Sequence, residues 1–331
     1  MATRTHAPGI TLLRTAAGSP PTVTQYKAFQ ALGCRIVAAD CEPASVGFHF
    51  ADAAHVVPRV GDPGYLERML DICALEGVNL FLPALDEELE LCGRHRERFE
   101  AGGTRLLLSG PLGLAVCADK LRMYEAFRAA RVPTPLTVAA QDYGPDVFER
   151  YPVIVKPRSG RGGTGVHLAR SHAEAAFFCD YVEAPVVQAR LEGTECTLDV
   201  LASLAGEVRI LSARKRLATE SGVSSKGVTH WRQDFLAPVQ AMVCSLGLVG
   251  PLNFQCFISP AGELAFTEIN ARLAGTAILS QAAGVPLFQG ILDLAQGRCP
   301  EPWLKPCQPL EMFRYWEELF RPPGLALEQE G

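Results

Sequence analysis

Apolar runs and helical stripes alternate along the first third of the chain. Short apolar runs at residues 10–15 and 35–40 are typical of buried strands, and the apolar residues between 19 and 33 recur at helical spacing. Gly33 stands where a C′ glycine ends a helix. This strand–helix–strand rhythm predicts parallel βαβ units, so we expect residues 1–112 to form an α/β domain with an open parallel sheet.

A second helix of this domain is predicted between residues 62 and 77. Asp62 fits the N-cap and Pro63 fits the first helical position, and an apolar stripe follows them. Two more apolar runs, at 79–85 and 104–110, complete the expected sheet.

The pattern changes in the second part of the chain. An amphipathic helix is predicted within 117–135, and from residue 151 onward short apolar segments are separated by glycine-containing turns. Such turns are typical of antiparallel hairpins. Helical stretches intervene at 171–182 and 237–247. This part of the chain is therefore expected to be α+β.

A glycine-rich stretch, GRGGTG at residues 160–165, lies between two predicted strands. No G-K-[ST] follows it, and a strand rather than a helix comes next, so neither a Walker A loop nor a dinucleotide fingerprint fits. The H-R-D and D-F-G motifs of protein kinases do not follow in the sequence either. A glycine hairpin still offers backbone N–H groups to a phosphate. Lys156, in the apolar run before the glycines, would be costly to bury without an anionic partner such as a phosphate.

Composition narrows the class of protein. The 331 residues carry a formal net charge of −5, so a nucleic-acid partner is not expected. No apolar run is long enough to span a bilayer, so a membrane partner is not expected either. The eleven cysteines are scattered without C-x-x-C or zinc spacing, which favours reduced thiols in a cytoplasmic protein.

Several motifs, in order along the chain, resemble the ATP-grasp superfamily. They are Asp119-Lys120, VIVKPRSGRGGTGV at 153–166, LNFQCFI at 252–258 and LAFTEINARLAGT at 264–276. The resemblance is to single-module relatives of the carbamoyl-phosphate synthase large chain, of the carboxylate–amine ligase type. It implies a pre-grasp α/β domain followed by a two-lobe α+β ATP-grasp fold.

The resemblance also implies a division of the chain. The N-lobe, with a linker helix and the glycine-rich hairpin, is expected at residues 113–186. The C-lobe, with metal and substrate sites, is expected at 187–310, and a C-terminal tail at 311–331. ATP would lie between the lobes together with Mg²⁺, for which Mn²⁺ is an expected substitute, and the glycine loop would close over the phosphates.

Ten residues are expected to hold the nucleotide on the strength of this resemblance. They are Lys120, Lys156, Ser159, Gly160, Gly162, Gly163, Gln188, Ala189, Leu191 and Glu195. Backbone groups from Ala189 to Leu191 would face adenine, and Gln188 or Glu195 would hold the ribose. Many relatives have Gln-Glu where this chain has Gln188-Ala189, so the usual acidic contact is left open. Arg158 and Arg161 are candidates for the γ-phosphate.

Oxygen-bearing side chains alternate along two predicted strands of the C-lobe. Glu268 and Asn270 lie two residues apart on a strand and therefore face the same side, where a carboxylate and an amide oxygen suit Mg²⁺. The resemblance adds Gln255 as a third metal ligand. Arg272 comes next on that face and is expected to stabilise charge on the transferred phosphoryl group or the acyl phosphate.

A basic cluster is the candidate substrate site. Arg214 or Arg216 would suit the carboxylate being activated, by bidentate pairing, and which of Arg214, Lys215 and Arg216 faces inward is open. The Ser/Gly-rich stretch 221–227 is expected to be a mobile loop. Asp86 fits either a ligand contact at the carboxyl edge of the parallel sheet or the N-cap of a helix.

The function expected from the resemblance is ATP-dependent ligation. A small-molecule carboxylate would be activated as an acyl phosphate and attacked by an amine, with release of ADP and phosphate. Bicarbonate-dependent carboxylase or carbamoyl-phosphate-type chemistry and a non-catalytic ATP-binding module are the alternatives. The single module speaks against full carbamoyl phosphate synthesis. A homodimer is left open, and the identity of the substrates is not readable.

Overall fold

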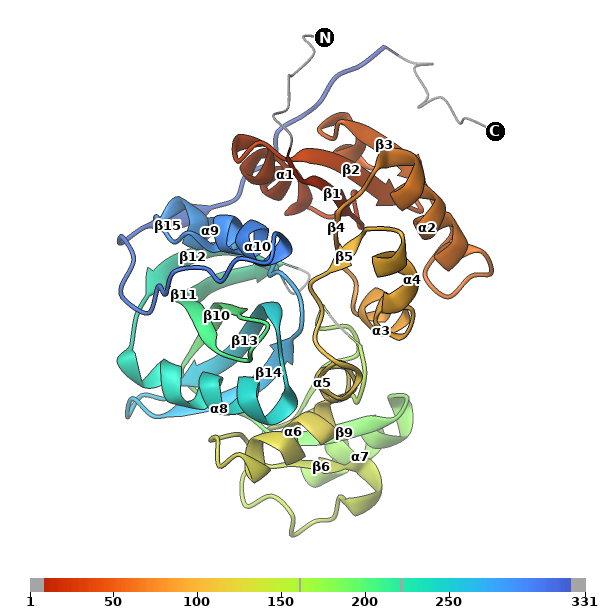
Figure 1. The fold of residues 1–331 in the computed structure, drawn as a ribbon. Helices are drawn as coiled ribbons and strands as arrows, with labels where there is room; N and C mark the ends of the chain where they lie inside the picture. The colour runs from red at the N-terminus through yellow and green to blue at the C-terminus, as the bar shows by residue number, and fades with distance from the viewer. Residues whose placement is uncertain (1–8, 161, 221–222, 323–331) are drawn as a thin grey trace.

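The computed structural model describes residues 9–160, 162–220 and 223–322. Within these ranges the chain forms three sheets, one in each of three parts that surround a common centre (Figure 1). We call these parts the pre-grasp domain (9–112), the N-lobe (113–189) and the C-lobe (190–322). None of the helices in the described ranges combines the length and apolar character that a membrane crossing requires. All eleven cysteines are free thiols.

The pre-grasp domain has the parallel open sheet that its sequence predicts. Its strands lie in the order β3-β2-β1-β4-β5, and each neighbouring pair is parallel. The elements are β1 Thr11–Arg14, α1 Thr22–Ala31, β2 Arg35–Asp40, η1 Val46–His49, β3 Ala53–Val56, α2 Tyr65–Glu76, β4 Leu80–Leu82, α3 Asp86–Arg94, α4 Arg96–Ala101 and β5 Arg105–Leu106. Gly33 follows α1 with φ 86°, as predicted for a glycine that ends a helix.

The predicted start of α2 is wrong. The helix begins at Tyr65, and its N-cap is Gly64 at φ 87°, not Asp62. The Tyr65 N–H donates to the Asp62 carbonyl oxygen at 3.2 Å, so residues 62–65 close a turn before the helix. A left-handed backbone at position 64 suits glycine, and it places Asp62 and Pro63 outside the helix.

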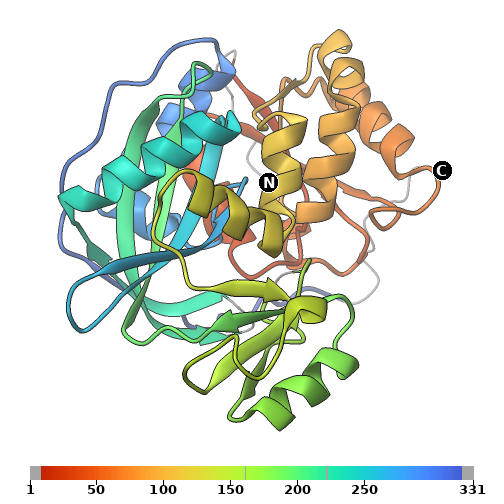
Figure 2. The ribbon, with the colours of Figure 1, turned by 90° about the horizontal axis from the view of Figure 1, so that it is seen from below.

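The N-lobe confirms the glycine-rich hairpin. Its antiparallel sheet has the order β6-β9-β7-β8, and β7 pairs directly with β8, so the glycines form the tip between them. The elements are α5 Pro111–Cys117, α6 Lys120–Ala129, β6 Thr137–Ala139, η2 Ala140–Asp142, β7 Val153–Pro157, β8 His167–Ala169, α7 His172–Tyr181 and β9 Pro185–Ala189. Figure 2 shows α7 on the outer side of this small sheet. A lobe boundary at 186 would divide β9, so we place the boundary after Ala189.

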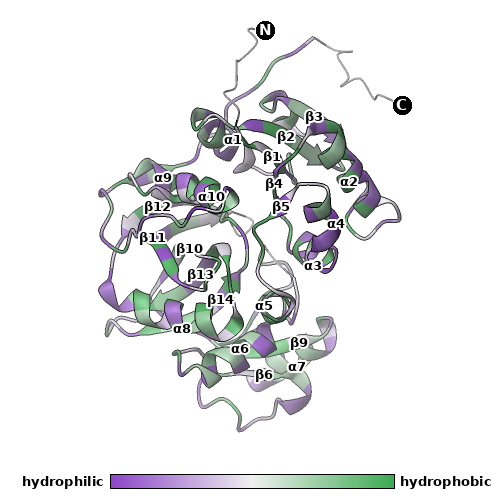
Figure 3. Cartoon of the chain, in the orientation of Figure 1, coloured by the Kyte–Doolittle hydropathy of each residue, from purple (hydrophilic) through white to green (hydrophobic). Residues whose placement is uncertain are grey.

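The C-lobe is built on an antiparallel sheet with the order β14-β13-β10-β11-β12-β15. Its elements are β10 Thr194–Ala202, β11 Val208–Glu220, β12 Val223–His230, η3 Gln233–Phe235, α8 Leu236–Leu246, β13 Gly250–Ile258, β14 Leu264–Asn270, α9 Ile278–Ala282, α10 Leu287–Ala295 and β15 Glu311–Phe313. In Figure 3 its central strands are mainly hydrophobic, whereas α4 of the pre-grasp domain is mainly hydrophilic.

Two expectations for the C-lobe are corrected here. Residues 223–227 lie in β12, between β11 and β15, rather than in a mobile loop. β11 pairs along this stretch and β15 pairs with Lys226 and Gly227, and this tertiary context overrides the loop-like Ser/Gly composition. Ser221 and Gly222 lie outside the described residues. Residues 311–313, which the sequence gives to a tail, pair with β12 as β15, and residues 323–331 are outside the described part.

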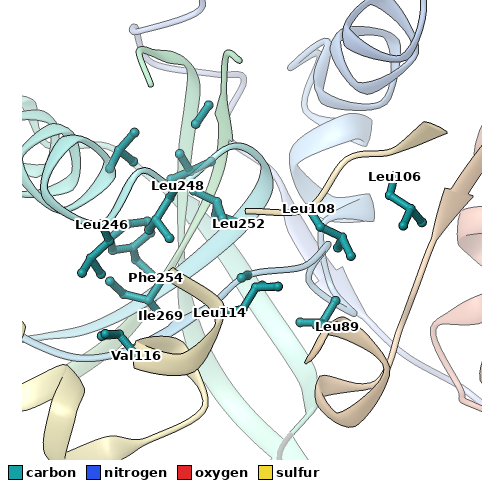
Figure 4. Close-up of a cluster of buried hydrophobic side chains, with 14 of the residues drawn as sticks. Leu89, Leu106, Leu108, Leu114, Val116, Leu246, Leu248, Leu252, Phe254 and Ile269 are labelled. Carbon is teal, nitrogen blue, oxygen red and sulfur yellow. The ribbon is translucent and has the colours of Figure 1, made fainter. Parts of the chain in front are cut away.

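The pre-grasp domain and the C-lobe share one apolar core. Leu106 and Leu108 lie in the same buried cluster as Leu248 and Leu252 (Figure 4). Gly250 allows the close approach, because a Cβ there would lie 2.6 Å from the Leu107 carbonyl oxygen. The buried residues of the N-lobe sheet form a cluster of their own. The fold therefore joins the pre-grasp domain firmly to the C-lobe and attaches the N-lobe sheet as a more separate unit.

Candidate active site

A cavity of about 1190 Å³ is lined by residues of the pre-grasp domain, the N-lobe and the C-lobe. The lining includes all ten residues expected to hold the nucleotide, the three expected metal ligands and the three expected catalytic arginines: Lys120, Lys156, Ser159, Gly160, Gly162, Gly163, Gln188, Ala189, Leu191, Glu195, Gln255, Glu268, Asn270, Arg214, Arg216 and Arg272. These residues span 152 positions of the chain, from Lys120 to Arg272. The fold thus brings the expected set to one place, although their individual roles are not decided by this.

Lys156 lies on β7, which places it in the cavity wall while Val153 and Val155 pack into the N-lobe core. Its Nζ donates to the Gln188 Oε1 at 2.9 Å, and the Gln188 Nε2 donates to the Thr137 Oγ1 at 2.8 Å. Burial lowers the pKa of Lys156 to about 8; Glu268 opposes this shift and Lys120 adds to it. Gln188 therefore orients the lysine.

The hinge backbone is less available to a ligand than expected. The Ala189 N–H donates to the Leu136 carbonyl oxygen at 2.8 Å, so it is not offered to adenine. The Glu195 carboxylate accepts a hydrogen bond from the Arg216 Nη1 at 2.6 Å, and burial raises its pKa. Backbone at 190–193 lines the cavity beyond these two residues.

The start of α6 is tied to the glycine loop. Asp119 is the N-cap of α6, and the Lys120 Nζ donates to the Gly160 carbonyl oxygen at 3.0 Å. Burial lowers the pKa of Lys120, against the fields of Glu268 and Asp86. Gly160, Gly162, Gly163 and Gly165 all have positive φ, which explains why this loop needs glycines.

The sequence predicts that Arg158 contacts the γ-phosphate, but Arg158 does not line the cavity. Its Nε lies 2.8 and 2.9 Å from the two carboxylate oxygens of Asp119, so the N-cap carboxylate holds its guanidinium. Asp119 can cap α6 and bind Arg158 together, because the cap uses only its Oδ1, which accepts from the N–H groups of Leu121 and Arg122. Arg161, the other γ-phosphate candidate, lies outside the described residues.

Oxygen-bearing side chains form two adjacent rows across the C-lobe sheet. Glu268 of β14 pairs with Gln255 of β13, and Asn270 pairs with Asn253. The Asn270 Nδ2 donates to the Asn253 Oδ1 at 3.2 Å, so the Asn270 Oδ1 is left for another partner. Among the described residues no group of three His, Cys, Asp or Glu side chains is placed to hold a metal ion. One carboxylate with two amide oxygens remains as the donor set, and its chemistry suits Mg²⁺.

Arg214 is committed to the protein's own carboxylate. Its Nε and Nη2 donate to the two oxygens of Asp199 at 3.1 and 3.2 Å, and the Ser280 Oγ donates to Asp199 at 2.6 Å. The bidentate pairing that we expected with a substrate is therefore made with Asp199. Arg214 and Arg216 both line the cavity and Lys215 does not.

The Arg214–Asp199 pair gives a testable prediction about stability. Both residues are at most 2% exposed, so Asp199→Ala would leave a buried guanidinium without its counter-ion. We expect a loss of about 3–5 kcal/mol in the free energy of unfolding, measured by urea denaturation. The control is Asp234→Ala, which removes the exposed Arg232–Asp234 pair and should cost less than about 1 kcal/mol. Similar small losses in both variants would contradict a structural role for Asp199.

Sequence reasoning missed the pre-grasp side of the cavity. Arg14, Ser19, Thr22 and Gln25 line it, although they come from β1, the loop after it and α1. The position of these residues could have indicated the site, because they follow a predicted parallel strand and such sheets present ligands at the carboxyl ends of their strands.

Asp86 neither caps α3 nor lines the cavity. The N-cap of α3 is Leu85, and the Glu88 carboxylate accepts from the Leu85 N–H at 3.0 Å. Asp86 instead accepts from the Arg272 Nε at 2.6 Å, across the junction between the pre-grasp domain and the C-lobe. The expected N-cap at Asp86 is wrong because the glutamate three residues into the helix satisfies the start of α3.

Comparison with known proteins identifies the family of both parts. Residues 12–107 match a PylC-like N-terminal domain, and residues 117–276 match an ATP-grasp domain. The chain therefore contains a PylC-like N-terminal domain followed by an ATP-grasp domain. It is 25% identical over 283 residues to the carbamoyl phosphate synthase arginine-specific large chain of Halalkalibacterium halodurans. That match covers 78% of this chain and 26% of the relative, so the chain spans about a quarter of the relative's length.

Solved structures agree on the fold. The N5-carboxyaminoimidazole synthetase of Staphylococcus aureus, complexed with ADP, superimposes with a TM-score of 0.73 at 16% identity, over 93% of this chain and 82% of that one. The biotin carboxylase domain dimer of Hydrogenobacter thermophilus 2-oxoglutarate carboxylase, solved with MgADP, ADP and bicarbonate, gives 0.72 at 18% identity, over 90% and 73%. The expected pre-grasp and ATP-grasp architecture is thereby confirmed.

Proposed function

We propose that this protein is an ATP-dependent carboxylate–amine ligase. The observation that carries the proposal is one cavity in which Lys120 and Lys156 of the N-lobe face Gln255, Glu268 and Asn270 of the C-lobe. Cations on one wall and metal-binding oxygens on the other are what a nucleoside triphosphate and its Mg²⁺ need, and phosphoryl transfer requires little more than such positioning and charge. The ATP-grasp domain match supports the same conclusion.

In the proposed reaction a substrate carboxylate oxygen attacks the γ-phosphorus of ATP, and ADP leaves. An amine then attacks the acyl carbon, and phosphate leaves as the amide forms. Lys156, oriented by Gln188, and Lys120 would bind the phosphates, and the glycine loop would cover them with backbone N–H groups. Glu268, Asn270 and Gln255 would hold Mg²⁺, which supplies positive charge to the phosphates when bound. Arg272 would stabilise charge on the acyl phosphate.

Three finer points belong to the proposal. Mn²⁺ is expected to replace Mg²⁺, because both accept the same oxygen donors. We expect a cytoplasmic location, in keeping with eleven free cysteines, and we leave a homodimer open. The biotin carboxylase domain of Hydrogenobacter thermophilus 2-oxoglutarate carboxylase was solved as a dimer.

The proposal is tested by a phosphate-release screen of carboxylates and amines, each alone and in pairs, with Mg²⁺ and ATP. We expect ADP and phosphate only when an acceptable pair is present, and mass spectrometry should find the condensed product. Release that needs bicarbonate would favour carboxylase-type chemistry instead. ATP binding without turnover across the whole panel would point to a non-catalytic module and contradict the proposal.

A further inference from the structure

Arg14 is a buried cation on the cavity wall without a counter-ion of its own. It is 4% exposed and lies at the carboxyl end of β1, the central strand of the pre-grasp sheet. Its Nη1 donates to the Leu82 carbonyl oxygen at 2.7 Å and its Nη2 to the Gln25 Oε1 at 2.6 Å. Among the described residues no carboxylate lies within ion-pair distance of it, and its Nε has no acceptor. A guanidinium carries five N–H donors, so three of them remain without a partner.

Glu88, the neighbouring carboxylate, does not form an ion pair with Arg14. Glu88 is buried, and its oxygens accept from the Thr15 hydroxyl, the Tyr65 hydroxyl and two backbone N–H groups. The other charged neighbour is Arg272, a second cation, whose Nε is held by Asp86. Burying a cation in this way is costly unless an anion joins it.

The start of α1 adds to the positive field. The helix begins at Thr22 on the cavity wall, with Pro21 as N-cap, no side-chain cap and no acidic residue in its first turn. A helix start that lacks such groups favours an anion nearby. Figure 1 shows α1 beside α9 of the C-lobe, at the junction where Gln25 donates to the Ala274 carbonyl oxygen at 3.0 Å.

This region is distinct from the proposed phosphoryl-transfer centre. Along β14 and its continuation, Glu268 lies near the two lysines, Arg272 contacts α3, and Ala274 contacts α1 through Gln25. Arg14 therefore lies at the end of the cavity away from Glu268, on the side where this chain segment reaches Ala274. A group bound beside it would be held while another part of the same molecule reacts.

We propose that Arg14, with the start of α1, binds an oxyanion of the substrate that is not phosphorylated. This inference rests on the proposed function and narrows it to a substrate with a second anionic group, either a carboxylate or a phosphate ester. Both groups accept the paired N–H donors of arginine.

The test is isothermal titration of the protein saturated with Mg²⁺ and a non-hydrolysable ATP analogue, which fills the nucleotide phosphate sites. Inorganic phosphate and succinate are the two probes. We expect at least one of them to bind the wild-type complex and to lose at least about tenfold in affinity in Arg14→Met. A preference for phosphate would indicate a phosphate ester, and a preference for succinate would indicate a carboxylate.

A second variant tests the inference even if Arg14→Met fails to fold. Ser19→Glu places a carboxylate at the cavity wall without removing a buried group, and it should lose anion binding to a similar degree. Arg59→Met, at an exposed position of the same domain, should bind the probes as the wild type does. Probes that fail to bind the wild-type complex, or that bind all variants equally, would overturn the inference while analogue binding persists. Absence of analogue binding would instead overturn the proposed function.

Discussion

Replacing Glu268 with glutamine is expected to lower the rate of phosphate release at least about a thousandfold, or about 4 kcal/mol of transition-state stabilisation. Glu268 is the only carboxylate among the three proposed metal-binding side chains in the described cavity, and it pairs across the strands with Gln255. Glutamine keeps the size of the side chain and removes its charge, so the metal would lose the one anionic ligand among these three side chains. The rate is measured on a substrate pair found in the screen, with saturating ATP and Mg²⁺.

Glu263 offers a matched control for this variant. It lies on the same β13–β14 hairpin but is exposed at the turn, so Glu263→Gln should retain the wild-type rate. Thermal unfolding of both variants should match the wild type, which separates lost chemistry from lost folding. A Glu268→Gln protein that is folded and retains a rate within tenfold of the wild type would contradict the proposed metal site.

The affinity for ATP is expected to fall as the pH rises through about 8. Burial lowers the pKa of Lys156 to about 8 in the free protein, so this lysine loses its charge above that pH. A phosphate binds the protonated amine better than the neutral one, so bound nucleotide must raise the pKa. Affinity should therefore decrease by up to about tenfold per pH unit between the free and the bound pKa values. Titrations of the ATP analogue between pH 6.5 and 9.5 measure this profile.

Lys156→Met should weaken analogue binding by about tenfold or more at pH 7 and remove most of the slope above pH 8. Lys120 also has a lowered pKa, so a smaller residual slope is expected. Lys305→Met, at an exposed position outside the cavity lining, is the control that should keep both affinity and profile. A flat wild-type profile would mean that Lys156 does not contact the phosphates.

Local pattern was sufficient to predict the parallel sheet, the glycine hairpin and the face shared by Glu268 and Asn270. In each case the determining property is periodic or positional: alternation along a strand, helical spacing, or positive φ at a glycine. The order of motifs along the chain then indicated the family. These properties can be predicted from the sequence because they depend on neighbours within a few residues.

The errors concern partners that are distant in sequence. Arg214 carries no sequence signal that Asp199, on the adjacent strand, would occupy its guanidinium. Residues 223–227 have loop-like composition, and only pairing with β11 and β15 makes them a strand. Arg14 ends an apolar run and carries no local signal of a binding role, because its exposure to the cavity depends on how the pre-grasp domain packs on the C-lobe. Pairing, burial and domain packing are properties of the folded chain.

The central claim is that a carboxylate is activated by phosphorylation. It is tested most directly by supplying the carboxylate from the screen with ¹⁸O in its carboxyl group, together with the amine, ATP and Mg²⁺, and analysing the released phosphate by mass spectrometry. An acyl phosphate transfers a carboxyl oxygen to the phosphate when the amine displaces it, so the account predicts released phosphate that carries ¹⁸O. Unlabelled phosphate, formed while the condensed product accumulates, would contradict it.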